Sequence, residues 1–164
     1  MNIKKMVVTS VVAGVALAGA SAPAFANSPH FVNASASLDT SHQLVVSFKE
    51  AGLGNEVTNI TASASATALW GCINSGQNHP QARNKESASG LVSTSQDFTP
   101  RNGNISGSLV VSPPGPSAGF TCPDDMVVAL LQASYSNITV TDNTHGISSG
   151  VPGTLTYTNK DVRF

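Results

Sequence analysis

The stretch Val57–Cys72, VTNITASASATALWGC, decides the fold because its side chains alternate between apolar and polar. With a period of two, one face carries an isoleucine, four alanines, a tryptophan and a cysteine, and the other carries asparagine, threonine and serine. This pattern is typical of a long, half-buried β-strand. Alanine also favours helices, but a helix here would have no apolar stripe at the helical period. The alternation therefore predicts one strand over the whole stretch.

The alanine-rich face has little volume, so the layer that covers it must come close or supply large side chains. Trp70 closes one end of this face beside Cys72. We interpret Trp70 as a core residue packed over a disulfide, and an exposed aromatic platform for a sugar or peptide is the functional alternative. The candidates for the large partners of the alanines are Phe31, Leu44, Val46, Phe48, Leu130, Leu131 and Tyr135.

Residues 1–26 have the features of a secretory signal peptide. Lys4 and Lys5 precede an uncharged run, and the segment ends in Ala-Pro-Ala-Phe-Ala at Ala26. We predict cleavage after Ala26, with cleavage after Ala24 as the runner-up, and therefore a secreted, extracellular protein. No later stretch approaches the roughly 20 apolar residues of a membrane span, so we expect no membrane span in the mature chain.

Residues 27–164 are expected to form a single domain with enough apolar residues for a core. Without the leader, six basic residues stand against nine acidic ones, which gives a net charge of about minus three. These charges are scattered, and a nucleic-acid partner would need a basic face to neutralise phosphates. The composition predicts an extracellular β-protein that does not bind nucleic acid.

Cys72 and Cys122 are the two cysteines of the chain. In an exported protein they are expected to form an intramolecular disulfide, with an intermolecular bridge or two free thiols as the alternatives. A disulfide between them would close a loop of about fifty residues, which stabilises a fold by roughly 4 kcal/mol in the loop-entropy description. No further cysteine or suitably spaced histidine accompanies the pair, so the cysteines do not predict a zinc site.

Two hairpins are expected from alternation and turn chemistry. Segments 30–38 and 43–49 predict the first hairpin, and segments 91–98 and 105–112 predict the second across an Asn102-Gly103 turn. Residues 126–142 form the second long β segment, whose phase changes at a bulge or crossing near residues 132–136.

Short strands separated by turns, with no credible helix, predict an all-β chain that folds as a single antiparallel β-sandwich. We expect the disulfide to bridge the two layers. The architecture is immunoglobulin-like without the immunoglobulin motif, because Trp70 lies only two residues before the first cysteine.

The segment 73–90, INSGQNHPQARNKESASG, is the longest stretch without periodicity. Connections of this length in a compact domain are often functional or disordered. Asn78, His79, Arg83 and Lys85 lie close together in it. We predict a candidate binding loop here, and a solvated excursion anchored by the disulfide is the alternative.

Three segments resemble parts of a group of small secreted β-rich proteins from actinobacteria: FKEAGLGN (Phe48–Asn55), CINSGQNHPQARNK (Cys72–Lys85) and SYSNITVTD (Ser134–Asp142). The resemblance spans most of the mature chain. It implies export and a disulfide between Cys72 and Cys122, and it implies no activity and no functional residue.

The sequence predicts no catalytic residue, metal site or cofactor. The four histidines lie near expected strand ends or in loops, and no serine stands in a Gly-x-Ser-x-Gly motif. Asp124 with Asp125, or Asp142 with Asn143, offer oxygen ligands for calcium, but they lack an EF-hand pattern.

We therefore expect a non-catalytic extracellular binding or cell-surface-associated module whose partner is an extracellular protein, peptide or glycan. The alternative is a small secreted hydrolase or a hydrolase (protease) inhibitor. An inhibitor would use a rigid exposed loop, and the segment that follows Cys72 is the candidate for it.

Overall fold

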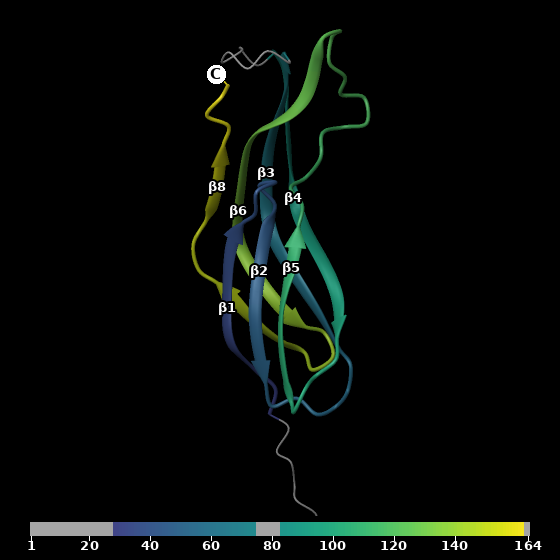
Figure 1. Cartoon of the computed structure of the whole chain (residues 1–164), viewed down its shortest axis with the longest axis vertical. Helices are drawn as coiled ribbons and strands as arrows, with labels where there is room; N and C mark the ends of the chain where they lie inside the picture. The colour runs from purple at the N-terminus through teal and green to yellow at the C-terminus, as the bar shows by residue number, and fades with distance from the viewer. Residues whose placement is uncertain (1–27, 75–82, 163–164) are drawn as a thin grey trace, which may run out of the picture.

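The computed structural model describes residues 28–74 and 83–162, and every regular element in these ranges is a β-strand. The expected signal peptide lies outside the described residues. Among those that are described, no helix has the length and hydropathy needed to cross a membrane. The strands are β1 (His30–Leu38), β2 (Leu44–Ala51), β3 (Thr58–Asn74), β4 (Arg83–Phe98), β5 (Asn104–Val111), β6 (Met126–Asp142), β7 (Ile147–Val151) and β8 (Leu155–Thr158) (Figure 1).

The strands form two antiparallel sheets packed face to face, which confirms the predicted all-β sandwich. The smaller sheet has the order β1-β2-β5. The larger sheet has the order β4-β3-β6-β7, and β8 also pairs with β6. At the sides of the sandwich β1 lies near β7 and β4 lies near β5. The upper ends of β3, β4 and β6 extend past the smaller sheet (Figure 1).

Strand β3 confirms the prediction made from the alternating stretch. It pairs with β4 on one side and with β6 on the other, so its backbone is hydrogen-bonded along both edges. Its even-numbered residues from Thr58 to Ala68 are buried, and its odd-numbered residues are partly or fully exposed. The side chains of Thr61, Ser63, Ser65 and Thr67 therefore lie on the outer face of the larger sheet, whereas Thr58 is buried.

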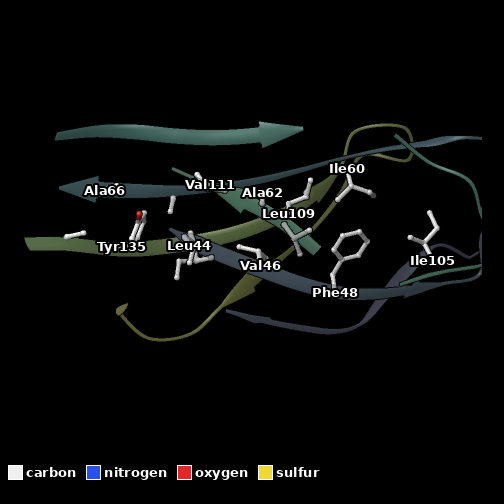
Figure 2. Packing of buried hydrophobic residues seen from close by; sticks show 14 of the residues in the cluster. Leu44, Val46, Phe48, Ile60, Ala62, Ala66, Ile105, Leu109, Val111 and Tyr135 are labelled. Atoms are coloured by element: carbon white, nitrogen blue, oxygen red, sulfur yellow. The ribbon is translucent and has the colours of Figure 1, made fainter. Parts of the chain in front are cut away.

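The smaller sheet supplies most of the large side chains that cover the alanines of β3. These side chains come from β2 and β5, whereas Tyr135, Leu130 and Leu131 belong to β6, the neighbour of β3 in the same sheet. The expectation that the last three face the alanines from the opposite layer is wrong. Figure 2 shows the packing of Leu44, Val46, Phe48, Ile105, Leu109 and Val111 against Ile60, Ala62, Ala66 and Tyr135.

The first hairpin, formed by β1 and β2, is confirmed, and a bulge in β1 explains its mixed pattern. The register shifts between Phe31 and Asn33, so Val32 is an extra residue opposite β2. Phe31 and Ala34 can therefore both pack against the core, although the alternation in sequence places them on opposite faces. Val32 is 54% exposed.

The second expected hairpin is wrong in its pairing. Asn102 and Gly103 have positive φ angles of 50° and 72°, as the predicted Asn-Gly turn requires. However, β5 pairs with β2 and β4 pairs with β3, so the turn joins strands of different sheets. At the turn itself, the described residues form one isolated β-bridge, between Arg101 and Asn104.

Strand β4 corrects the expected loop at 73–90. β3 continues to Asn74 and β4 begins at Arg83, so both ends of that segment are strand. Residues 75–82 lie outside the described residues. The change of phase expected near residues 132–136 is present, because the register between β3 and β6 shifts between Leu130 and Gln132 and again between Ser136 and Thr139.

Candidate functional site

The disulfide between Cys72 and Cys122 is present, with its two Cα atoms 5.5 Å apart. Cys72 lies on β3, but Cys122 lies in the connection between β5 and β6. The bridge therefore fastens this connection to the larger sheet and does not join the two layers, contrary to the expectation from sequence. The connection is the segment at the upper right of Figure 1.

Trp70 and Glu86 hold the same connection to the larger sheet. The Nε1 atom of Trp70 donates a hydrogen bond to the carbonyl oxygen of Pro114 over 2.9 Å. The Glu86 carboxylate accepts hydrogen bonds from the backbone N–H and the hydroxyl of Ser117, at 2.6 and 3.0 Å. Trp70 is partly buried, and its only polar group is engaged within the chain. These contacts agree with a structural role for Trp70 more than with an aromatic platform.

Of the four residues of the candidate binding loop, the structure describes two, Arg83 and Lys85. Asn78 and His79 lie outside the described residues. Arg83 is the first residue of β4 and stands opposite Cys72 in the register. Lys85 is exposed on the same strand. The described part of the candidate loop is therefore the beginning of an edge strand.

A shallow trough of about 610 Å³ crosses the larger sheet over β4, β3, β6 and β8. Its sides are two rows of residues that stand opposite one another in the register. Between them lies a row that includes Ala68 and Ala133, each only 3% exposed, so the side chains of this middle row point to the core. The flanking rows therefore lie on the outer face; they are Ser89, Thr67, Ser134 and Thr156, and Ser87, Leu69, Gln132 and Thr158.

The flanking rows of the trough carry hydroxyl groups, one carboxamide and one leucine, and three alanines and Tyr157 complete its lining. No aspartate, glutamate, histidine, lysine or arginine occurs among the described residues that line it. Serine and threonine hydroxyls both donate and accept hydrogen bonds, and a glutamine carboxamide does the same through separate atoms. Such a surface can bind a neutral polar chain by many weak hydrogen bonds.

A second feature, which the sequence did not predict as a site, is a buried cluster of Glu50, Asp142 and His145. Glu50 lies on β2 and Asp142 is the last residue of β6, and both are fully buried. His145 lies in the turn that follows β6, and its side chain is 24% exposed. One ligand atom from each of the three side chains lies within 4.8 Å of the others.

The turn after β6 orients Asp142. Its Oδ1 atom accepts hydrogen bonds from the backbone N–H groups of Thr144 and His145, at 2.8 and 3.0 Å. Its Oδ2 atom lies 2.5 Å from Nδ1 of His145. Burial raises the pKa of Asp142, but hydrogen bonds with Glu50, His145 and Thr144 outweigh burial and hold it below its ordinary value.

Glu50 has the opposite environment. Neither of its carboxylate oxygens accepts a hydrogen bond from any described group. Burial, followed by the hydrogen bond and the negative charge of Asp142, raises the pKa of Glu50 to about 8. As a carboxylate, Glu50 would place two unsatisfied oxygens in the core, which is costly unless a proton or a cation is present.

The sequence contains a signal for this cluster. In Leu44–Ala51 the residues that share the buried face are Leu44, Val46, Phe48 and Glu50, so a carboxylate falls on an apolar face. The calcium hypothesis paired Asp142 with Asn143, but the Asn143 carboxamide donates to Asn59 and Thr61, each over 2.7 Å.

Comparison of the chain with models of protein families, with curated proteins and with solved structures found no match. The function is therefore argued from the trough and from the buried cluster, which are the two features with a defined geometry. They lie in different parts of the molecule, since the cluster includes the last residue of β6 and the trough crosses β6 at residues 132–134.

Proposed function

We propose that the protein is a secreted, non-catalytic module that binds a neutral extracellular glycan along the trough of the larger sheet. The observation that carries the proposal is the pair of uncharged, hydroxyl-rich rows across β4, β3, β6 and β8. The volume of the trough lies within the range typical of small-molecule sites, roughly 300–1,000 Å³.

The chemistry of the two rows suits a sugar chain. The hydroxyl groups and the Gln132 carboxamide can exchange hydrogen bonds with sugar hydroxyls, directly or through bridging water. Leu69 offers an apolar contact for the C–H face of a sugar ring. Because the described lining has no cationic side chain, an acidic polysaccharide would find no counter-charge there.

Binding without turnover is the role that this lining supports. Glycoside hydrolysis uses a pair of carboxyl groups that flank the scissile bond. The described lining residues include no carboxylate and no histidine. The carboxylates of the buried cluster have no exposure with which to reach a polymer.

Two features support the extracellular setting. The amino-terminal leader pattern predicts export, and the disulfide between Cys72 and Cys122 is the kind of bond that persists in oxidising compartments. A binding module that acts outside the cell fits both.

Affinity electrophoresis in gels that contain neutral α-glucan, β-glucan or mannan tests the proposal. We expect at least one of these polymers to retard the wild-type protein. Thr67→Arg and Ser89→Arg place a long charged side chain in the trough and should reduce the affinity at least tenfold. Ser93→Arg is the matched control, because Ser93 is an exposed residue of β4 outside the trough.

A triple variant of His79, Arg83 and Lys85 to alanine separates the trough from the candidate loop. If the trough binds the polymer, this variant keeps the retardation of the wild type. Loss of retardation in the triple variant, with no loss in Thr67→Arg, would contradict the proposal and move the binding surface to the beginning of β4.

A further inference from the structure

We propose that Glu50, Asp142 and His145 form a site for one divalent transition-metal ion of the zinc type, which links the two sheets. The site is independent of the glycan proposal. Glu50 comes from the smaller sheet, and Asp142 comes from the larger one. A metal held by both would join the layers, which the disulfide does not do.

The fold brings the three side chains together from positions far apart in the sequence. Glu50 stands on the buried face of β2, after Leu44, Val46 and Phe48. Asp142 ends the central strand β6, and the turn closed by the bond from Gly146 N–H to the Asp142 carbonyl returns His145 toward it. The ligand atoms lie within 4.8 Å of one another, so one ion can reach all three after small movements.

The observation that points to a ligand is the state of the Glu50 carboxylate. The side chain is fully buried, and neither of its oxygens accepts a hydrogen bond from a described residue. Two buried carboxylates this close repel each other unless one is protonated or a cation lies between them. A metal ion supplies the positive charge and also a bond to at least one of the Glu50 oxygens.

The donor set selects the class of metal. Calcium takes six to eight oxygen ligands, which two carboxylates and an imidazole nitrogen do not provide. Zinc binds histidine nitrogen and carboxylate oxygen in a tetrahedral arrangement, and a water molecule can take the fourth position. Binding at Nδ1 requires the imidazole to be neutral at that atom, so the ion replaces the contact between His145 and Asp142.

The geometry requires an adjustment at His145. Ligand atoms on a tetrahedral zinc ion lie about 3.3 Å apart, whereas His145 Nδ1 and Asp142 Oδ2 are 2.5 Å apart. The imidazole can move outward, because the His145 side chain is 24% exposed. The same exposure gives the ion a path from solvent. Asp142 keeps its position, because its other oxygen is held by two backbone N–H groups.

Isothermal titration of the EDTA-treated, dialysed mature protein with zinc chloride tests the site. We expect one zinc ion per chain. Glu50→Gln removes one ligand charge while keeping the shape of the side chain, and His145→Ala removes a partly exposed ligand, so each should weaken binding more than about tenfold. His42→Asn is the control: His42 precedes the other end of β2 and has a φ of 62°, which asparagine tolerates.

The outcomes separate clearly. One zinc ion in wild type and in His42→Asn, with weak binding in both cluster variants, supports the site. No zinc binding by the wild type would overturn it, and a proton on Glu50 would then account for the buried carboxylates. Equal binding in the cluster variants, loss of binding in His42→Asn, or preference for calcium over zinc would overturn it as well.

Discussion

Tyr135 is the largest of the fully buried side chains among the described residues. It lies on β6 beside Ala66 of β3, where the alanine leaves room for the ring. Its hydroxyl donates a hydrogen bond to the carbonyl oxygen of His42 over 3.2 Å, so the larger sheet is connected to the turn before β2. One side chain therefore fills core volume and fastens a turn of the smaller sheet.

The environment of Tyr135 predicts a loss of stability at alkaline pH. Burial raises the pKa of Tyr135 to about 12, a backbone hydrogen bond at Leu44 lowers it in part, and the charge of Asp39 adds to the rise. The unfolded chain releases the phenolic proton near the ordinary value of 10.0, whereas the folded chain keeps it. The contribution of protonated Tyr135 to the free energy of unfolding is therefore complete below pH 10. It is lost as the pH rises through about 12.

Urea unfolding at pH 9 and pH 11 measures this effect. We expect the free energy of unfolding of the wild type to fall more between these two values than that of Tyr135→Phe, which has no proton to lose. Tyr157, whose pKa burial also raises, is present in both proteins. The same fall in wild type and variant would show that Tyr135 is not the group responsible.

Phe98 and Gly107 show how the elements fit together. The Phe98 ring lies edge-on to Phe48, with ring centroids 5.2 Å apart. Gly107 stands opposite Phe48 in the pairing of β2 and β5. A Cβ atom at Gly107 would lie 2.4 Å from Cε1 of Phe98, so the ring occupies the space that a side chain would need. The glycine is what allows the last residue of β4 to pack between the sheets.

Gly107→Ala should therefore destabilise the protein, by roughly 1–3 kcal/mol as is usual for overpacking. Gly90→Ala is the matched control. Gly90 lies in edge strand β4, and a Cβ atom at this position would have no neighbour within 4 Å. This substitution should therefore be neutral or slightly stabilising. Chemical denaturation of both variants measures the difference. Equal stabilities would contradict the packing of Phe98 against β5.

The strands that the sequence predicts best are those with one face in the core. The sequence predicts β3 and the hairpin of β1 and β2 because buried or partly buried apolar residues alternate with more exposed polar residues. The first half of β4 was not predicted. It lies at the edge of its sheet and is polar on both faces, so no alternation marks it.

Pairing between strands was harder to predict than the strands themselves. The Asn102-Gly103 turn is a local signal, and it is present. Which sheet each flanking strand joins depends on partners such as Phe48 and Ser63, which lie far away in the sequence. The sequence does not predict the trough either, because its rows combine four strands whose register is set by tertiary contacts.

At the scale of the whole molecule, the two ends of the larger sheet are held differently. At one end the disulfide closes a separation of 50 residues, which stabilises the fold by roughly 4 kcal/mol in the loop-entropy description. At the other end the buried cluster brings Glu50 of the smaller sheet to Asp142 of the larger one. The trough lies on β3 and β6 between these two ends, so its floor belongs to the most extensively paired part of the fold.

The most direct test of the proposed function is an NMR titration of the ¹⁵N-labelled mature protein with a neutral oligosaccharide from the polymer that retards it. If the trough is the binding site, the amide shifts that change belong to the rows of β4, β3, β6 and β8, with the largest changes at Thr67, Leu69, Gln132 and Ser134. Changes confined to residues 75–85, or to the smaller sheet, would contradict the account.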